Sequence, residues 1–136
     1  MRRTGTPIFL LAAALITGVG STTSAAQVDT VTVSGVSATV YTSDANPGGK
    51  GVFENLGEHL KACDIQNDGY RAVTTFLRSD TGQTFTVQDA DGANGNCVDN
   101  NLSLAEGTEG WIQVCLQNGS SGPQIFCTPW WEWVQA

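Results

Sequence analysis

Four tryptophans are the residues of this 136-residue chain whose chemistry points most directly to binding. Trp130, Trp131 and Trp133 crowd the C-terminus, and Trp111 precedes them. Indole rings are large and amphipathic, so an exposed set built on Trp111, Trp131 and Trp133 would bind a sugar ring or a protein partner. The alternative is that these rings close the ends of a small core. Because side chains alternate along a strand, we expect Trp131 and Trp133 to be more exposed than Trp130.

The residue types of catalysis are present, but not in a catalytic pattern. His59 is the single histidine, which excludes a multi-histidine metal site, and no Gly-x-Ser-x-Gly motif supplies a serine nucleophile. Carboxylate pairs such as Glu54 with Glu58, or Glu106 with Glu109, have the composition of a glycosidase site. Such pairs are more commonly solvated surface charge. We therefore predict that the chain is not an enzyme and needs no cofactor.

Two acidic runs resemble calcium loops in composition. The first contains Asp64, Asp68 and Gly69 but has Thr75 where an EF-hand has its bidentate glutamate. The second, residues 89–96, is better supplied with Asp and Asn oxygens. Since Asp-Gly and Asn-Gly pairs are also the usual residues of tight turns, we expect turns here and no metal.

The cysteines Cys63, Cys97, Cys115 and Cys127 indicate a disulfide framework, because an even number in a small exported domain is typical of one. A zinc site is the alternative, but the spacings contain no Cys-x-x-Cys pair. Four cysteines allow three connectivities. The hairpin described next selects Cys115–Cys127, which leaves Cys63–Cys97.

That hairpin is predicted from two β-rich runs, residues 111–117 and 124–134, on either side of a six-residue cluster of turn formers. A turn centred on Ser121 sets Cys115 opposite Cys127. The same register predicts three further opposed pairs: Leu116 with Phe126, Val114 with Thr128, and Ile112 with Trp130.

The first 26 residues have the pattern of a secretory signal peptide. Two arginines follow Met1, residues 8–16 form a short apolar run, and small residues lead to a cleavage site after Ala26. Twin-arginine export and an uncleaved anchor are alternatives, although the apolar run is short for a membrane span. We expect a secreted, extracellular protein whose residues 27–136 form one domain.

The excess of acidic over basic residues argues against some classes of binding partner. Without residues 1–26 the chain keeps all 13 acidic residues and four of its six basic ones, a formal charge of about −9. Phosphate recognition needs clustered cations, so we expect no nucleic-acid partner. The same charge is repelled by anionic lipid, so we expect no membrane partner after signal cleavage. We expect a monomer that binds an extracellular polysaccharide or protein.

Alternating Val, Thr and aromatic residues with frequent turn signals predict an all-β fold, an antiparallel β-sandwich or small barrel with two disulfides. The expected elements are strands within 27–41, a loop over 43–51, one helical turn within 52–60, a three-strand meander over 57–89, and a long loop over 89–101.

The turn and disulfide residues resemble those of small secreted four-cysteine β-domain proteins of actinomycete bacteria. The likeness covers residues 50–128 and rests on these pairs and cysteines: Gly57-Glu58, Cys63-Asp64, Asp68-Gly69, Cys97, Glu106-Gly107, Val114-Cys115 and Cys127. It implies the fold and the export but no catalytic residue, since these proteins mostly have no assigned function. The tryptophan-rich ending lies outside it.

We therefore expect a secreted, disulfide-stabilised protein that binds through its C-terminal tryptophans. The alternative is a proteinaceous inhibitor of an extracellular hydrolase, which would insert the disulfide-pinned loop 92–101 into the enzyme's cleft. A small hydrolase is the third class.

Overall fold

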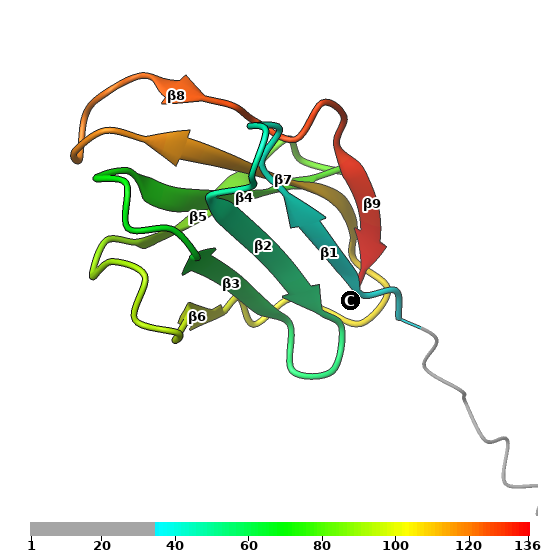
Figure 1. Cartoon of the computed structure of the whole chain (residues 1–136). Helices are drawn as coiled ribbons and strands as arrows, with labels where there is room; N and C mark the ends of the chain where they lie inside the picture. Colours follow the sequence, from blue (N-terminus) through cyan, green and yellow to red (C-terminus); the bar gives the residue numbers. More distant parts are fainter. Residues whose placement is uncertain (1–34) are drawn as a thin grey trace, which may run out of the picture. The chain divides into compact units, whose positions relative to one another are not determined.

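Alternating apolar and polar residues produce nine strands in the part of the chain that the computed structural model describes, residues 35–136 (Figure 1). The predicted signal peptide and the first part of the strand expected over 27–41 lie outside it. The strands are β1 (Ala38–Tyr41), β2 (Gly49–Glu54), β3 (His59–Asp64), β4 (Arg71–Arg78), β5 (Thr84–Asp89), β6 (Val98–Asn101), β7 (Glu109–Gln117), β8 (Gln124–Ile125) and β9 (Glu132–Gln135). Over these residues no helix is long and apolar enough to span a membrane.

The strands form two antiparallel sheets packed face to face. One sheet has the order β1-β2-β3-β6, and the other has the order β5-β4-β7-β8, with β9 also paired to β7. β7 is therefore flanked by β4 along one side and by β8 and β9 in succession along the other. The fold is the antiparallel sandwich with two disulfides that the sequence predicts.

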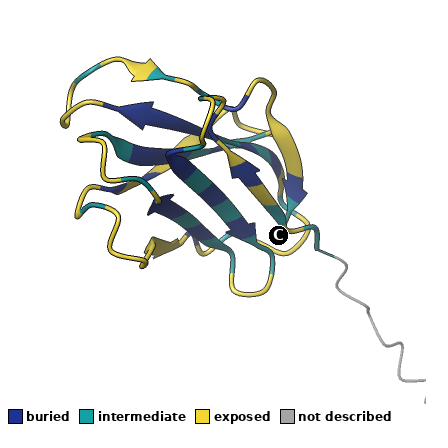
Figure 2. Cartoon of the chain, viewed as in Figure 1, coloured by how far each residue is buried: buried dark blue, intermediate teal, exposed yellow. Residues whose placement is uncertain are grey.

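The core lies between the two sheets, where every second side chain points inward. Figure 2 shows the resulting alternation of buried and intermediate positions along β2 and the first part of β3. Phe53 of β2 stacks on Phe76 of β4 with ring centroids 5.4 Å apart, which joins the two sheets. Leu60, Ile112 and Val114 complete the centre and are fully buried.

Glycine lets the sheets approach closely at one end of the sandwich. The inward positions of β2 are Gly49, Gly51 and Phe53, all buried. A Cβ on Gly51 would lie 2.8 Å from Thr74 Oγ1 and 3.0 Å from Val114 Cβ. Since these atoms belong to β4 and β7, the space a side chain would need on β2 is already occupied by the opposite sheet.

Several expectations about individual elements were wrong. The predicted meander over 57–89 is split between sheets, because β3 pairs with β2 and β6 whereas β4 pairs with β5 and β7. The predicted loop over 43–51 ends at Gly49, where β2 begins, and β2 replaces the start of the expected helical turn. The predicted loop over 89–101 contains β6.

Substitution of Gly51 by alanine should destabilise the domain by about 1 to 3 kcal/mol, because the new methyl group overpacks the contact between the sheets. The measurement is urea unfolding followed by tryptophan fluorescence. Removing the opposing hydroxyl and methyl with Thr74→Ala should recover part of the loss in the double variant. A Gly51→Ala protein with wild-type stability would contradict the close approach.

Candidate ligand-binding surface

Two tryptophans lie opposite each other on the outward face of the second sheet. Trp111 of β7 is the register partner of Trp133 of β9 and, on the other side, of Leu77 of β4. Directly opposed residues of antiparallel strands share a face. That face is outward, because the neighbouring Gly110 points toward the core, where an added Cβ would meet the Phe76 ring. Leu77, Trp111 and Trp133 therefore form one continuous row.

Uncharged polar residues surround this row. The next outward positions across the sheet are Thr86, Thr75 and Gln113, and Thr84 lies opposite Leu77. We call the outward set Leu77, Trp111, Trp133, Thr75, Thr84, Thr86 and Gln113 the tryptophan face. The outward-facing charges lie at the two ends of this face, at Arg71 of β4 and Glu109 of β7, and the exposed Glu132 precedes Trp133 in β9. A neutral, aromatic surface is thus present on a strongly acidic protein.

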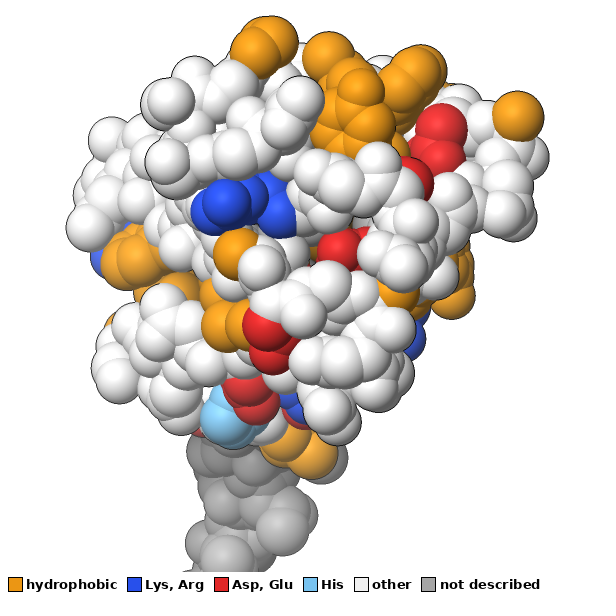
Figure 3. All heavy atoms as spheres, turned by 60° about the vertical axis from the view of Figure 1, so that its left-hand side comes forward, with side chains coloured by type: hydrophobic (Ala, Val, Ile, Leu, Met, Phe, Trp, Pro, Cys, Tyr) orange, Lys and Arg blue, Asp and Glu red, His pale blue; other side chains and the backbone are white. Residues whose placement is uncertain are grey.

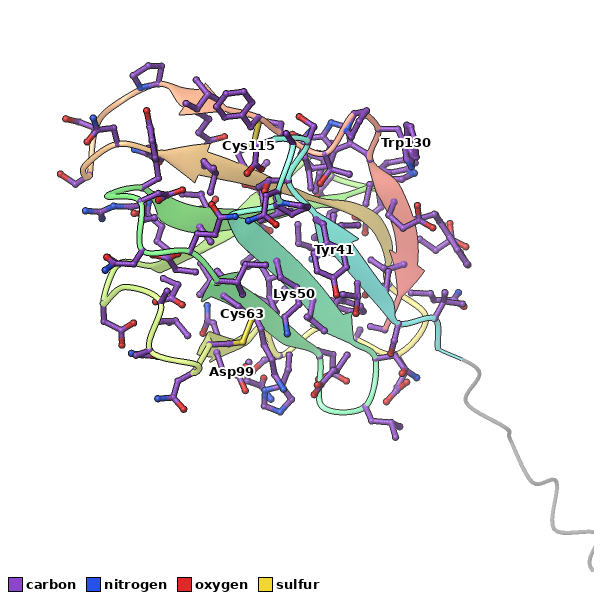
Figure 4. The ribbon with its side chains drawn as sticks, in the orientation of Figure 1. Tyr41, Lys50, Cys63, Asp99, Cys115 and Trp130 are labelled. Atoms are coloured by element: carbon purple, nitrogen blue, oxygen red, sulfur yellow. A yellow bond between two sulfur atoms is a disulfide. The ribbon has the colours of Figure 1, made fainter. Side chains whose placement is uncertain are left out.

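The C-terminal segment carries a concentration of exposed rings. Of the eight large hydrophobic side chains exposed in residues 35–136, four belong to it: Phe126, Trp130, Trp131 and Trp133. Trp131 and Trp133 are 39% and 41% exposed, as their predicted role requires. The prediction that Trp130 would be less exposed than these two was wrong, because Trp130 is 67% exposed at the corner before β9 (Figure 4).

Trp130 does not lie opposite Ile112 because the strand predicted over 124–134 is broken at two places. Leu116 pairs with Ile125 rather than Phe126, and Phe126 takes a left-handed backbone with a φ of 51°. Phe126 therefore acts as one extra residue in this strand and brings Thr128 back to its predicted position opposite Val114. There the Thr128 N–H donates to the Val114 carbonyl at 2.8 Å. A corner at Pro129 and Trp130 then shifts the register again, so that Ile112 pairs with Glu132 rather than Trp130.

Both predicted disulfides are present, Cys115–Cys127 and Cys63–Cys97. The first fastens the C-terminal segment to β7 directly before Thr128. The two disulfides indicate an oxidising compartment.

Thr128 is the polar anchor of the same segment. Its Oγ1 lies 3.0 Å from the carbonyl oxygen of Tyr41 in β1 and 3.3 Å from both the N and the O of Val114 in β7. One buried hydroxyl therefore joins the edges of the two sheets next to the corner that leads to the tryptophans. Beyond the corner, the backbones of Gln135 and Val36 exchange two hydrogen bonds, which ties β9 to the chain before β1.

Two of the candidate catalytic residues, His59 and Glu54, have polar side-chain partners at the surface. His59 Nδ1 lies 2.9 Å from Asp99 Oδ1, and Lys61 Nζ donates to Glu54 at 2.7 Å. Figure 3 shows the single histidine beside acidic side chains. Cys63, the nearest thiol in sequence, is in a disulfide, so the structure offers no Cys–His pair at this position.

The predicted acidic turns contribute to the structure through two buried carboxyls. Asp89 Oδ2 accepts a hydrogen bond from the Asp64 backbone N–H at 2.7 Å, which links β5 to β3 across the sandwich edge. Burial raises the pKa of both carboxyls above their ordinary value of 3.8. In residues 35–136, no three His, Cys, Asp or Glu side chains gather as a set able to hold a metal ion.

Comparison with protein-family models, curated proteins and solved structures gives no match to this chain. The expected likeness to secreted four-cysteine proteins is therefore confirmed only as a small all-β domain with two disulfides.

Replacement of Thr128 by valine should lower the free energy of unfolding by about 1 to 3 kcal/mol, because it strands the Tyr41 carbonyl and the Val114 N–H without Oγ1. Urea denaturation measures the loss. Thr39→Val, at an exposed position of β1, is the matched control. Equal effects of the two substitutions would refute the anchoring role.

Asp89→Asn should make the protein relatively more stable as the pH rises from about 4 to about 7. Asparagine keeps an oxygen for the Asp64 N–H and removes the buried charge. A carboxyl with a raised folded-state pKa favours folding below its unfolded-state pKa and loses that contribution as pH rises through the folded-state pKa. The difference in Tm between variant and wild type, followed across this range, measures the effect, and a constant difference would contradict it.

Proposed function

We propose that this protein is an extracellular binding domain that holds a neutral polysaccharide on the tryptophan face. The observation that carries the proposal is the pairing of Trp111 with Trp133 on the outward side of one sheet. Two indoles fixed on adjacent strands offer apolar area at little cost in conformational entropy, since the backbone already holds them in place.

The chemistry around the rings favours sugar. Thr75, Thr84, Thr86 and Gln113 supply hydroxyl and amide groups of the kind that hydrogen-bond sugar hydroxyls, and sugars present apolar C–H faces to aromatic rings. The outward positions between Arg71 and Glu109 are uncharged, although the chain carries 13 acidic residues. A neutral face suits a neutral polymer, because no charged group there has to lose its water when the ligand binds.

The site has the form of an open face. A flat face suits a long polymer that lies across several strands, whereas a small ligand requires a concave pocket that buries most of its surface. The predicted signal peptide and the two disulfides support an extracellular location, where such polymers occur.

The test is retention of the purified mature protein on insoluble chitin, cellulose and peptidoglycan, with tryptophan emission followed in parallel. We expect retention and a shifted emission, and at least about tenfold weaker binding for Trp133→Ala, because stacked aromatic rings carry much of such binding energy. Trp131→Ala should also weaken binding.

Leu56→Ala is the matched control, since Leu56 is 80% exposed in the turn between β2 and β3. Retention that is unchanged in Trp133→Ala would refute the tryptophan face as the site. No retention on any polymer would refute polysaccharide binding and direct the search to protein partners. Inhibition of an extracellular hydrolase that depends on the loop 92–101 would instead establish the inhibitor alternative.

A further inference from the structure

A second row of residues crosses the outward face of the other sheet. Tyr41 of β1 pairs with Lys50 of β2, and Lys50 pairs with Cys63 of β3, so the three side chains share one face. Figure 4 shows them in line across the sheet. Cys63 continues the row into the exposed loop through its disulfide to Cys97. Tyr41 is 49% exposed beside Lys50.

A cavity of about 250 Å³ opens at the end of this row. Its apolar wall is made by the Cys63–Cys97 disulfide, Ile65 and Ala93, and Lys50 and Asn96 contribute the polar groups. The disulfide fixes the loop wall relative to β3, so little ordering is required when a ligand enters. The volume is below the roughly 300 to 1,000 Å³ of pockets that enclose a whole ligand, which suits a terminal group.

Lys50 supplies the positive charge in the lining of this cavity. Among residues 35–136, Lys61 and Arg78 form ion pairs with carboxylates, but Lys50 does not. The other charged lining residue, Asp64, is 3% exposed, belongs to the inward set of β3 and accepts a hydrogen bond from the Gln66 N–H. Within this part of the chain Arg71 also lacks a carboxylate partner, but its guanidinium donates to the Gln88 amide oxygen at 3.2 Å and it does not line this cavity.

We propose that this cavity binds the C-terminal residue of a peptide, with Lys50 holding the carboxylate and the disulfide, Ile65 and Ala93 holding a small apolar side chain. The ammonium supplies a charge-assisted hydrogen bond to the carboxylate. The acidic remainder of the surface repels anions at long range, so recognition depends on this short-range contact. The site is on the opposite sheet from the tryptophan face and is independent of it.

The test is a titration of ¹⁵N-labelled mature protein, with both disulfides formed, against N-acetyl-alanyl-alanine. We expect shifts of the amide signals of Ile65, Gly95 and Asn96, which line the cavity. Lys50→Gln should weaken binding about tenfold or more, the size expected for loss of one charge-assisted hydrogen bond. Lys61→Gln is the matched control on the same face, since its ammonium is already paired with Glu54, and it should bind as the wild type does.

Two further ligands test the carboxylate contact and the apolar contact separately. The same dipeptide with its C-terminus amidated should fail to bind, because it lacks the carboxylate. Glucuronate, which has a carboxylate on a polar ring, should bind at least about tenfold more weakly than the dipeptide, because it does not complement the apolar wall. The proposal is overturned if the acid dipeptide causes no shifts, if the amide binds equally well, if glucuronate binds as tightly, or if a folded Lys50→Gln protein keeps wild-type affinity.

Discussion

The attachment of the C-terminal segment to β7 is the constraint on which the tryptophan face depends. The Cys115–Cys127 disulfide and the Thr128 hydroxyl hold this segment at consecutive residues, immediately before the corner at Pro129. Because both anchors precede the corner, the chain must leave it beside β7, where β9 pairs again and brings Trp133 opposite Trp111. Without those anchors the four strand residues of β9 would be a short pairing at a sheet edge, with little to fix their register.

Packing inside the sandwich also keeps Trp111 on the outward face. Gly110 lies opposite Val134, and an added Cβ there would clash with the Phe76 ring, so close packing beneath β7 and β9 leaves no room for Trp111 to turn inward. The stacked Phe53 and Phe76 rings fill the centre, while Gly49 and Gly51 allow the sheets to close at the other end. An outward tryptophan on β7 is therefore a consequence of the core as well as of strand alternation.

The sequence predicted those features that depend on local pattern and on cysteine count. Alternation and turn residues identified the sandwich, and the run of turn formers around Ser121 placed Cys115 against Cys127. It could not predict the left-handed Phe126, because this backbone is rare for such a residue and leaves no pattern in the amino acids. Nor could it predict the corner at Pro129 and Trp130, which takes Trp130 out of the strand and leaves its ring exposed.

Other errors came from treating a turn signal as a hairpin. The turn residues Asp68 and Gly69 do lie where the chain reverses, but such residues do not decide whether the next strand joins the same sheet or the opposite one. The sequence pattern does not indicate the role of Lys50, for a related reason. It lies among glycines that read as a loop, and those glycines are instead inward positions of β2 that the opposite sheet requires to be small. Strand geometry then places Lys50 outward beside Tyr41.

Each disulfide consequently supports one candidate surface as well as the fold. Cys115–Cys127 closes a short segment next to the tryptophans, and Cys63–Cys97 fixes the wall of the cavity beside Lys50. In the loop-entropy model each bridge stabilises the folded state by about 3 to 4 kcal/mol, a large share for a domain of this size. Because the surfaces lie on opposite sheets, no single small ligand can reach both. A polymer that combines neutral sugars with peptide ends could engage the two together, and simultaneous engagement would strengthen binding through effective concentration without any new contact.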